Sequence, residues 1–269
     1  MQLRIATYNI HKGVSAFGRK ARIHGIKEAI NLLDADLVFL QEVQGQHDYH
    51  AEVHTQWPQV GQHEFLAGES HHSAYGMNAV YEHGHHGNAL LSRFPIASFA
   101  NHDVSDHEFE QRGILHAVVH KSGAEVHCFV IHLGLFAASR RRQVQALIDT
   151  IRSSLPPDAP LIIAGDFNDW NQKLSRTLYQ ELGVIEAFDV DAHHGTPTFS
   201  LKGVRALLTG TKARHARTFP AGLPWLCLDR VYLRGFRVAE ASVLKGAPWS
   251  SLSDHVPITA TLELLSGGK

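Results

Sequence analysis

The sequence predicts an α/β fold in which two mixed β-sheets pack face to face and helices cover their outer surfaces. Two observations predict this fold. Apolar strand patterns alternate with amphipathic helix patterns, and one strand–helix–strand unit occurs twice along the chain. In each unit both strands end on a polar residue. Because right-handed crossovers bring such strand ends to the same edge of a sheet, we expect a polar site at that edge.

The first unit joins a strand at 3–9 (LRIATYN) to a strand at 35–42 (ADLVFLQE) through a helix at 21–33. The helix has one apolar face, formed by Ile23, Ile26, Ile30 and Leu33. Asn9 and Glu42 are the polar residues at the two strand ends, 33 positions apart.

The second unit joins a strand at 125–132 (EVHCFVIH) to a strand within 159–168 (APLIIAGDFN) through a helix at 139–155. The apolar side of this helix is formed by Val144, Leu147, Ile148, Ile151 and Leu155. Its polar strand ends are His132 and Asp166, 34 positions apart. The apolar run LIIA suits a strand buried on both faces, so the carboxylates that follow it need a reason to be there.

Further strands are expected at 74–81, 87–94, 113–120, 226–233, 236–244 and 256–264. The chain has no linker rich in Pro, Gly or Ser, which predicts one domain over residues 1–269. Within it we expect two repeated halves, at about 1–124 and 125–269.

The composition is typical of a globular protein, with 44% hydrophobic and 19% charged residues. A formal net charge of -1 gives the whole molecule no attraction to nucleic acid or anionic membrane. No apolar run is long enough to span a bilayer, so stable membrane insertion is not expected. Cys128 and Cys227 fall in apolar strand patterns, and two buried thiols in so long a chain predict a cytoplasmic protein.

Six short stretches carry residues suited to chemistry: TYNIH, LQEV, IHLG, GDFND, LDRVYL and LSDHVPI. Each has a plainer structural interpretation. Asp166 and Asn168 could form an Asx turn or a helix cap, and Asp229 could pair with Arg230. His132 could be a hydrogen-bonded core residue. Six such stretches at successive strand ends favour a common site, because otherwise every plain interpretation must hold at once.

With these motifs in their order, the chain resembles the endonuclease/exonuclease/phosphatase superfamily, from Ile5 to about Thr261. This superfamily includes deoxyribonucleases, abasic-site endonucleases, neutral sphingomyelinases and inositol-polyphosphate 5-phosphatases. GDFN together with SDHxP is highly specific to it. The resemblance implies a four-layer α/β sandwich and phosphoester hydrolysis that depends on Mg²⁺ or Mn²⁺.

The resemblance also implies roles for the motif residues. Glu42 is expected to bind the metal, with Asn9 and Asp254 as further contacts, because Mg²⁺ prefers carboxylate and amide oxygens. His255 is expected to pair with Asp229 and to take part in proton transfer. Asp166 and Asn168 are expected to orient the attacking water and donate to phosphate, and His132 to bind a non-bridging oxygen. Either Asp166 or His255 could remove the proton from water.

The substrate remains open at this level. His11 stands where abasic-site endonucleases carry an acidic residue, and His132 stands where they carry a tyrosine. Both differences argue against a dedicated repair enzyme. We therefore favour a phosphodiesterase or phosphatase acting on a small phosphoester or a phospholipid headgroup. The alternatives are a DNA-directed nuclease and a non-catalytic phosphate-binding scaffold. No protein partner is indicated.

Several further residues are weaker candidates. Asn88, Arg112 and His11 could contact substrate, although Asn88 could equally serve a turn and Arg112 an ion pair. Arg140, Arg141 and Arg142 open the second helix and could attract phosphate or form a solvated face. A basic stretch, formed by Lys202, Arg205, Lys212, Arg214 and Arg217, precedes the loop TFPAGLPW, which could be a lid or an ordinary exposed loop. The chain has 21 histidines, of which His83, His85 and His86 could bind metal adventitiously.

Overall fold

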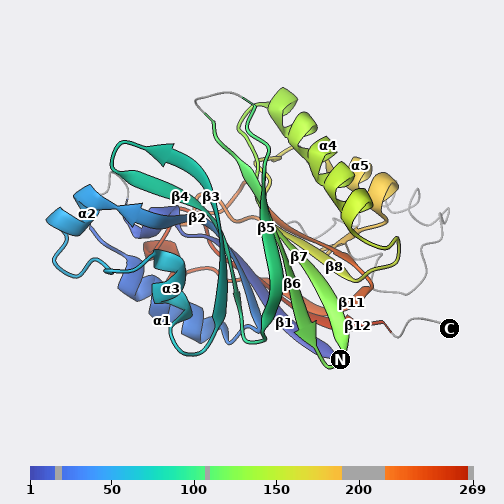
Figure 1. The fold of residues 1–269 in the computed structure, drawn as a ribbon, viewed down its shortest axis with the longest axis horizontal. Helices are drawn as coiled ribbons and strands as arrows, with labels where there is room; N and C mark the ends of the chain where they lie inside the picture. Colours follow the sequence, from blue (N-terminus) through green and yellow to red (C-terminus); the bar gives the residue numbers. More distant parts are fainter. Residues whose placement is uncertain (16–19, 107–109, 190–215, 266–269) are drawn as a thin grey trace.

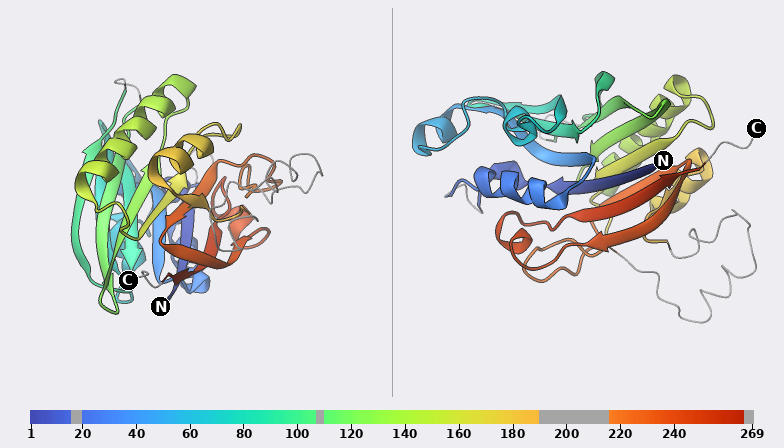
Figure 2. Two further views of the ribbon diagram at one scale, coloured as in Figure 1. Left: turned by 90° about the vertical axis from the view of Figure 1, so that its right-hand side faces the viewer. Right: turned by 90° about the horizontal axis from the view of Figure 1, so that it is seen from below.

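Two six-stranded mixed sheets pack face to face in the computed structural model, which describes residues 1–15, 20–106, 110–189 and 216–265 (Figure 1). The first sheet has the order β11-β12-β1-β2-β4-β3. Its strands are β1 (Gln2–Asn9), β2 (Leu37–His47), β3 (His72–Tyr81), β4 (Gly84–Ser92), β11 (Phe236–Val243) and β12 (Ile258–Leu264). Figure 2 shows the two C-terminal strands running beside β1.

The second sheet has the order β5-β6-β7-β8-β10-β9. Its strands are β5 (Ile96–Asp103), β6 (Gly113–Lys121), β7 (Ala124–His132), β8 (Leu161–Asp166), β9 (Ile185–Glu186) and β10 (Asp229–Arg234). In each sheet the third and fourth strands are parallel, and every other pairing between described strands is antiparallel. The two parallel pairs, β1–β2 and β7–β8, are the two strand–helix–strand units that the sequence predicts.

The boundary between the sheets differs from the boundary that we expect between repeated halves. A break at 124/125 lies in the β6–β7 hairpin, within one sheet. The chain instead changes sheets between β4 and β5, and its last two strands return to the first sheet. The two sheets therefore match in strand order without each being a continuous half of the sequence.

Helices cover the outer face of each sheet. The α-helices are α1 (Ile23–Leu33), α2 (Asp48–Val53), α3 (Gln62–Ala67), α4 (Ala137–Ser154) and α5 (Ser175–Leu182). The described residues also include the 3₁₀ helices η1 (His11–Gly13) and η4 (Trp249–Ser251). Figures 1 and 2 show α1 on the opposite side of the sheet pair from α4 and α5.

Three apolar cores separate these layers, because the central strands bury both of their faces. Leu37 and Phe39 of β2 point into the core between the sheets, whereas Val38 and Leu40 point into the core beneath α1. A third core joins β7 and β8 to α4 and α5. Alternate residues of one strand thus enter different cores, which explains why these strands appear as continuous apolar runs. The expected four-layer α/β sandwich is confirmed.

The strand directions bring distant segments to one edge of the sheet pair. The carboxyl ends of β1 and β2 share one edge, as do those of β7 and β8. Because β10 runs antiparallel to β8, its first residue, Asp229, pairs with Asp166. Likewise, β12 is antiparallel to β1, so the turn that precedes Ile258 lies near Thr7 and Asn9. In the part of the chain that the structure describes, no helix is long and apolar enough to cross a membrane.

Gly165 lies at this edge, where the backbones of β7 and β8 approach each other closely. Its φ is 149°, and a Cβ atom there would lie 1.9 Å from the carbonyl oxygen of Ile131 on β7. We predict that Gly165→Ala lowers the free energy of unfolding by about 2–5 kcal/mol, since strain and backbone overlap act together. Urea unfolding of purified protein measures this change. Gly222→Ala is the matched control, because a Cβ at Gly222 meets nothing within 4 Å. Equal unfolding midpoints for the two variants would contradict the prediction.

Candidate active site

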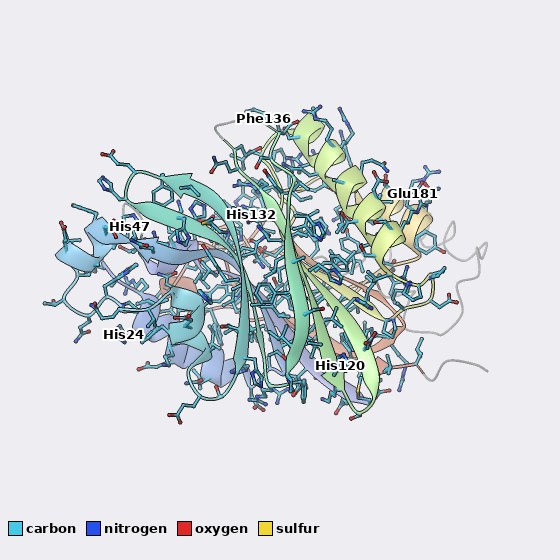
Figure 3. All side chains as sticks on the ribbon, viewed as in Figure 1. His24, His47, His120, His132, Phe136 and Glu181 are labelled. Carbon is cyan, nitrogen blue, oxygen red and sulfur yellow. The ribbon has the colours of Figure 1, made fainter. Side chains whose placement is uncertain are left out.

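Asp166 lies at the centre of the polar cluster. It ends β8 and is only 2% exposed. Its Oδ2 atom lies 3.3 Å from Asn9 Nδ2, 3.7 Å from His132 Nε2 and 3.7 Å from His255 Nε2. Those three residues come from the ends of β1 and β7 and from the turn before β12. Figure 3 shows the position of His132, near the centre of the molecule.

Glu42 joins this cluster through Asn9. The Asn9 Nδ2 atom donates to Glu42 Oε1 at 3.2 Å and to Asp166 Oδ2 at 3.3 Å, so one amide group separates the two carboxylates. Glu42 has a φ of 55° and lies where the register between β2 and β4 shifts. Such a bulge redirects a side chain, and bulges are common beside active sites.

The Asp229–His255 pair is buried on the other side of Asp166. His255 Nδ1 lies 2.7 Å from Asp229 Oδ2, and both residues are at most 5% exposed. Burial by itself lowers the pKa of His255, but the charges of Asp229, Asp166 and Asp254 outweigh it and raise the pKa to about 10. In the metal-free protein this imidazole is therefore protonated at neutral pH.

The two neighbours of His255 in this cluster have shifted pKa values of their own. Burial, helped by the charge of Asp229, raises the pKa of Asp166 to about 6. Burial also lowers the pKa of His132, and the nearby cations Arg112 and His255 lower it further. His132 is therefore a neutral imidazole next to a charged one. Proton transfer requires a protonated group and an unprotonated group at the same site.

Asn168 fixes the loop that follows β8. Its backbone N–H donates to Asp166 Oδ1 at 2.9 Å, and its Nδ2 donates to the carbonyl oxygen of Leu133 at 2.9 Å. Its φ of 50° lies in the left-handed region, which Asn tolerates better than most residues. The Asn168 amide thus connects the loops after β7 and β8, and its nitrogen carries a second hydrogen that can meet a ligand.

Asp254 pairs with His11 at the mouth of the site. His11 Nδ1 lies 3.2 Å from Asp254 Oδ2. This hydrogen bond raises the pKa of His11. Burial disfavours the charged form of Asp254, but His11 and His255 overcome this effect and lower its pKa.

Lys12 is a residue near the site that the sequence patterns did not indicate. Its Nζ lies 3.9 Å from Glu42 Oε2. His11, Lys12 and Gly13 have φ values of 46°, 58° and 70°, a run of left-handed conformations that is costly for the first two. Gln62 stabilises this turn, because its Nε2 donates to the Lys12 carbonyl while its Oε1 accepts from the backbone N–H of Gln44. The turn places one side chain against Asp254 and the next against Glu42.

The weaker candidates take structural positions near the cluster. Asn88 is a buried residue of β4 rather than a turn residue, and its Nδ2 donates to the carbonyl oxygens of Gly113 and Val130 in the other sheet. Arg112 lies 3.8 Å from Glu110 Oε1, and its Nε has no hydrogen-bond partner among the described residues. Of the basic stretch, Lys202, Arg205, Lys212 and Arg214 lie outside the described residues, whereas Arg217 is exposed.

The donor atoms of this site suit a hard divalent cation. Asp166, Asp229 and His255 offer ligand atoms within 4.8 Å of one another. The buried Oδ1 atom of Asp229 has no hydrogen-bond partner among the described residues, and such an oxygen calls for a water or an ion. Glu42 and Asp254 add two carboxylates whose side chains are 18% and 41% exposed. Carboxylate oxygens with open access to water are what Mg²⁺ and Mn²⁺ prefer.

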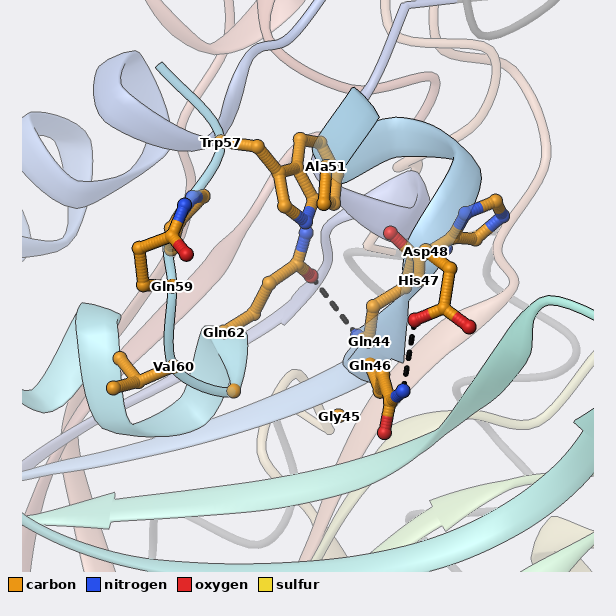
Figure 4. Close-up of a pocket in the computed structure, with 12 residues that line it drawn as sticks. Gln44, Gly45, Gln46, His47, Asp48, Ala51, Trp57, Gln59, Val60 and Gln62 are labelled. Atoms are coloured by element: carbon orange, nitrogen blue, oxygen red, sulfur yellow. Dashed lines mark hydrogen bonds between the residues drawn. The ribbon is translucent and has the colours of Figure 1, made fainter. Parts of the chain in front are cut away.

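A separate pocket of about 280 Å³ lies beyond Glu42 along β2 (Figure 4). It is lined by residues 44–48, 51 and 57–62. Gln62 belongs to this lining and also holds the Lys12 turn, so the pocket adjoins the site.

Among the histidines, His85 Nδ1 lies 2.9 Å from the Tyr75 hydroxyl. Within the described ranges His83, His85 and His86 are not part of a three-residue metal group.

Removing the Asp229 charge tests the electrostatics of the pair. We predict that Asp229→Asn lowers the pKa of His255 in metal-free protein, because burial then acts with less opposition. NMR titration measures this pKa, and His255→Gln identifies the resonance among the 21 histidines. The Asp229–His255 pair contributes stability that is fully present below pH 6.5 and is lost as the pH rises through about 10. Asp229→Asn is expected to lack most of this stability. Asp149→Asn, an exposed change on α4, is the control. An unchanged His255 pKa in Asp229→Asn would refute the account.

Comparison with known proteins shows the family to which this chain belongs. Residues 6–255 match the model of the Endonuclease/Exonuclease/phosphatase family. The uncharacterized protein YbhP of Escherichia coli K12 is 39% identical over 264 residues, covering 97% of this chain and 96% of that protein. The fold also resembles the endonuclease/exonuclease/phosphatase from Bacteroides vulgatus, with a TM-score of 0.72, 16% identity and coverage of 98% and 99% of the two chains.

A second similar structure is that of TDP2 of D. rerio, solved in complex with a single-stranded DNA product. Its TM-score is 0.65, with 18% identity and coverage of 97% of this chain and 99% of that one. Members of the matched family are typically metal-dependent phosphoester hydrolases. The match over residues 6–255 shows that this chain belongs to the endonuclease/exonuclease/phosphatase family.

Proposed function

We propose that this protein hydrolyses phosphoesters with the help of a divalent metal ion, by attack of water on phosphorus. One observation carries the proposal. A single buried carboxylate oxygen of Asp166 lies 3.3–3.7 Å from an amide and two imidazoles, which come from three other segments of the chain. A fold has little reason to collect these groups at one strand edge unless they act on a ligand.

The geometry supports a distinct role for each group. Asp166 orients the attacking water, because its Oδ2 faces the shared space while its Oδ1 accepts from the Asn168 N–H. His255 is held through Nδ1 by Asp229, which leaves Nε2 to hold or move a proton next to Asp166. His132, neutral and 8% exposed, offers its Nε2 to a non-bridging phosphoryl oxygen. Asp166 accepts the proton from water, or His255 does so from its unprotonated form.

Glu42, Asn9 and Asp254 are the proposed metal contacts. Glu42 and Asp254 are the more open carboxylates of the site, which suits an ion that keeps several of its waters. Asn9 directs its nitrogen toward Glu42 and Asp166, so contact through its oxygen requires the amide to turn over. When bound, Mg²⁺ or Mn²⁺ supplies Lewis-acid polarisation of the phosphoryl oxygen and stabilises the leaving oxygen.

We favour a small phosphoester or a phospholipid headgroup as the substrate. His11 pairs with Asp254 at the position where abasic-site endonucleases carry an acid, so this edge of the site differs from theirs. The net charge of -1 gives little general attraction to duplex DNA. The unpaired, buried Cys128 and Cys227 support a cytoplasmic location.

A DNA-directed nuclease is the second candidate. The fold is similar to that of TDP2, which was solved with a single-stranded DNA product. This alternative predicts Mg²⁺-dependent nicking of plasmid or abasic DNA that weakens steeply as salt is raised. Failure of such cleavage with both Mg²⁺ and Mn²⁺ removes it. A non-catalytic scaffold is the third candidate, and it predicts that Asp166→Ala and His255→Ala leave every function intact.

Hydrolysis of bis-p-nitrophenyl phosphate tests the chemistry. We expect turnover with Mg²⁺ or Mn²⁺ and its loss on chelation, because the metal carries part of the charge stabilisation. Asp166→Ala and His255→Ala are each expected to reduce the rate by at least about a hundredfold. Asp149→Ala is the control, since Asp149 is an exposed residue of α4. Activity that survives chelation or either active-site substitution contradicts the proposal.

Metal binding tests the role of Glu42 without turnover. Free Mn²⁺ is measured by electron paramagnetic resonance while protein is titrated in. Glu42→Gln is expected to weaken Mn²⁺ binding by at least about tenfold, because it removes a charged oxygen ligand. Glu28→Gln, on the exposed side of α1, provides the matched control. If Glu42→Gln binds Mn²⁺ as tightly as the native protein, the metal is held elsewhere, and Asp166, Asp229 and His255 become the ligands to test.

A further inference from the structure

Five large apolar side chains project from three loops around the catalytic cluster. We call them the apolar rim: Leu135 (59% exposed), Phe136 (63%), Trp170 (47%), Leu223 (79%) and Trp225 (63%). Large exposed apolar side chains that gather in one region mark an interaction site more often than scattered ones do. Figure 3 shows Phe136 at the outer edge of the molecule, where α4 begins.

Each loop lies close to a residue of the cluster, along the chain or through a ring contact. Leu135 and Phe136 follow His132 by three and four positions, and Trp170 follows Asn168 by two. The third loop runs from Phe219 to Leu226 and closes on itself, because the backbone N–H groups of Trp225 and Leu226 donate to the Phe219 carbonyl. The Phe219 ring lies 5.0 Å from the His255 ring. A surface that contacts the rim therefore lies next to the site.

Two buried arginines hold these loops in place. Arg140, 6% exposed, donates to the carbonyl oxygens of Gly134 and Leu135, and its guanidinium lies 5.3 Å from the Trp170 ring. Arg230, 2% exposed, donates to the carbonyl oxygens of Asp169 and Cys227. Arg140 thus ties the first loop to the second, and Arg230 ties the second to the third. The rim residues are exposed on supported loops rather than on loose ones.

The exposed charged residues within the three loops have one sign. The exposed charged residues within 134–142, 168–176 and 216–226 are all cations: Arg141, Arg142, Lys173, Arg176 and Arg217. Of these, Arg142 is already paired with Asp106. The single acid in these segments, Asp169, is buried and accepts from the Leu174 N–H. The three loops of a chain of net charge -1 therefore present only cations and apolar side chains among their exposed charged and large apolar residues.

We propose that the apolar rim adsorbs to a bilayer containing anionic phospholipids and brings the site to phosphoesters at the headgroup level. This inference rests on the proposed function and deepens it by naming a membrane surface as the place of the substrate. Tryptophan with neighbouring arginine and lysine is the combination that stabilises proteins at the membrane interface. Anionic headgroups attract the surrounding cations. The contact is shallow, and it differs from stable insertion.

A nucleic-acid strand is the competing partner, and the rim suits it less well. Stacking on bases needs flat aromatic faces. Two of the five rim residues, Leu135 and Leu223, have no such face, and Leu223 is the most exposed of the five at 79%. The free energy of transfer from water to lipid is favourable for aliphatic side chains, whatever their shape.

The tryptophans make this contact measurable in the unmodified protein. Of the four in the chain, Trp170 and Trp225 belong to the rim, whereas Trp57 and Trp249 are 7% and 8% exposed. We mix metal-free protein with vesicles of phosphatidylcholine containing one fifth phosphatidylglycerol. The expected result is a blue shift of tryptophan emission, protection from acrylamide quenching, and co-sedimentation that falls as salt is raised. Wild-type protein that neither shifts nor sediments with these vesicles overturns the proposal.

Matched variants locate the contact. Phe136→Ser with Leu223→Ser is expected to weaken vesicle binding by at least about tenfold. The control pair is Phe99→Ser with Leu32→Ser, which changes the same residue types at 56% and 68% exposure on β5 and α1. Circular dichroism melting shows that each protein is folded. Equal binding by rim and control variants overturns the proposal, as does rim-dependent binding of a fluorescein-labelled single-stranded oligonucleotide without vesicle binding.

Asp166→Ala separates this inference from the proposed function. The variant is expected to bind vesicles like the native protein, because its side chain lies below the rim and is buried. Vesicle binding without hydrolysis of any phosphoester means that the proposed function fails and that the docking surface stands. Hydrolysis of bis-p-nitrophenyl phosphate without vesicle binding means the reverse.

Discussion

The structure of the site depends on the burial of one carboxylate. Asp166 is 2% exposed, and its charge is tolerated only because Asn9, Asn168 and His255 direct donors toward it. These residues are more than 240 positions apart at the extremes, so the site exists only once both sheets have paired. Asp229 adds a second buried charge beside His255, and its Oδ1 has no hydrogen-bond partner among the residues that the structure describes, which suits a cation or a water. Buried charges of this kind cost stability, and such costs are common at functional sites.

Backbone strain is concentrated around the same cluster of residues. Seven non-glycine residues have positive φ among those described, and four of them, His11, Lys12, Glu42 and Asn168, surround the cluster. Left-handed conformations cost free energy at such residues, and they persist when surrounding contacts determine them. Gln62 holds the turn of His11 and Lys12, and the β-bulge opposite β4 turns Glu42 toward Asn9. The strain is the consequence of aiming several side chains at one point.

The loops around the site show a second use of buried charge. Arg140 and Arg230 are buried and donate to backbone carbonyl oxygens of these loops. The sequence predicts that Arg140 attracts phosphate or lies on a solvated face, whereas its buried guanidinium donates to carbonyl oxygens of the protein. The three loops that these arginines support carry exposed cations and no exposed acid, although the net charge of the whole chain is -1. Distribution rather than net charge decides which partner such a surface attracts.

The sequence by itself determined the layers and the polar strand ends. Continuous apolar runs such as LIIA predicted strands buried on both faces, helical spacing predicted α1 and α4, and six short motifs indicated the family. These features are local, so periodicity reveals them. Only the tertiary structure decided the bulge at Glu42, the Lys12–Glu42 contact and the role of Asn88 between the sheets. It also decided that Arg140 and Arg230 tie together the three loops that carry the five exposed apolar side chains. Such features depend on contacts between residues far apart in the chain, which no pattern within a single segment encodes.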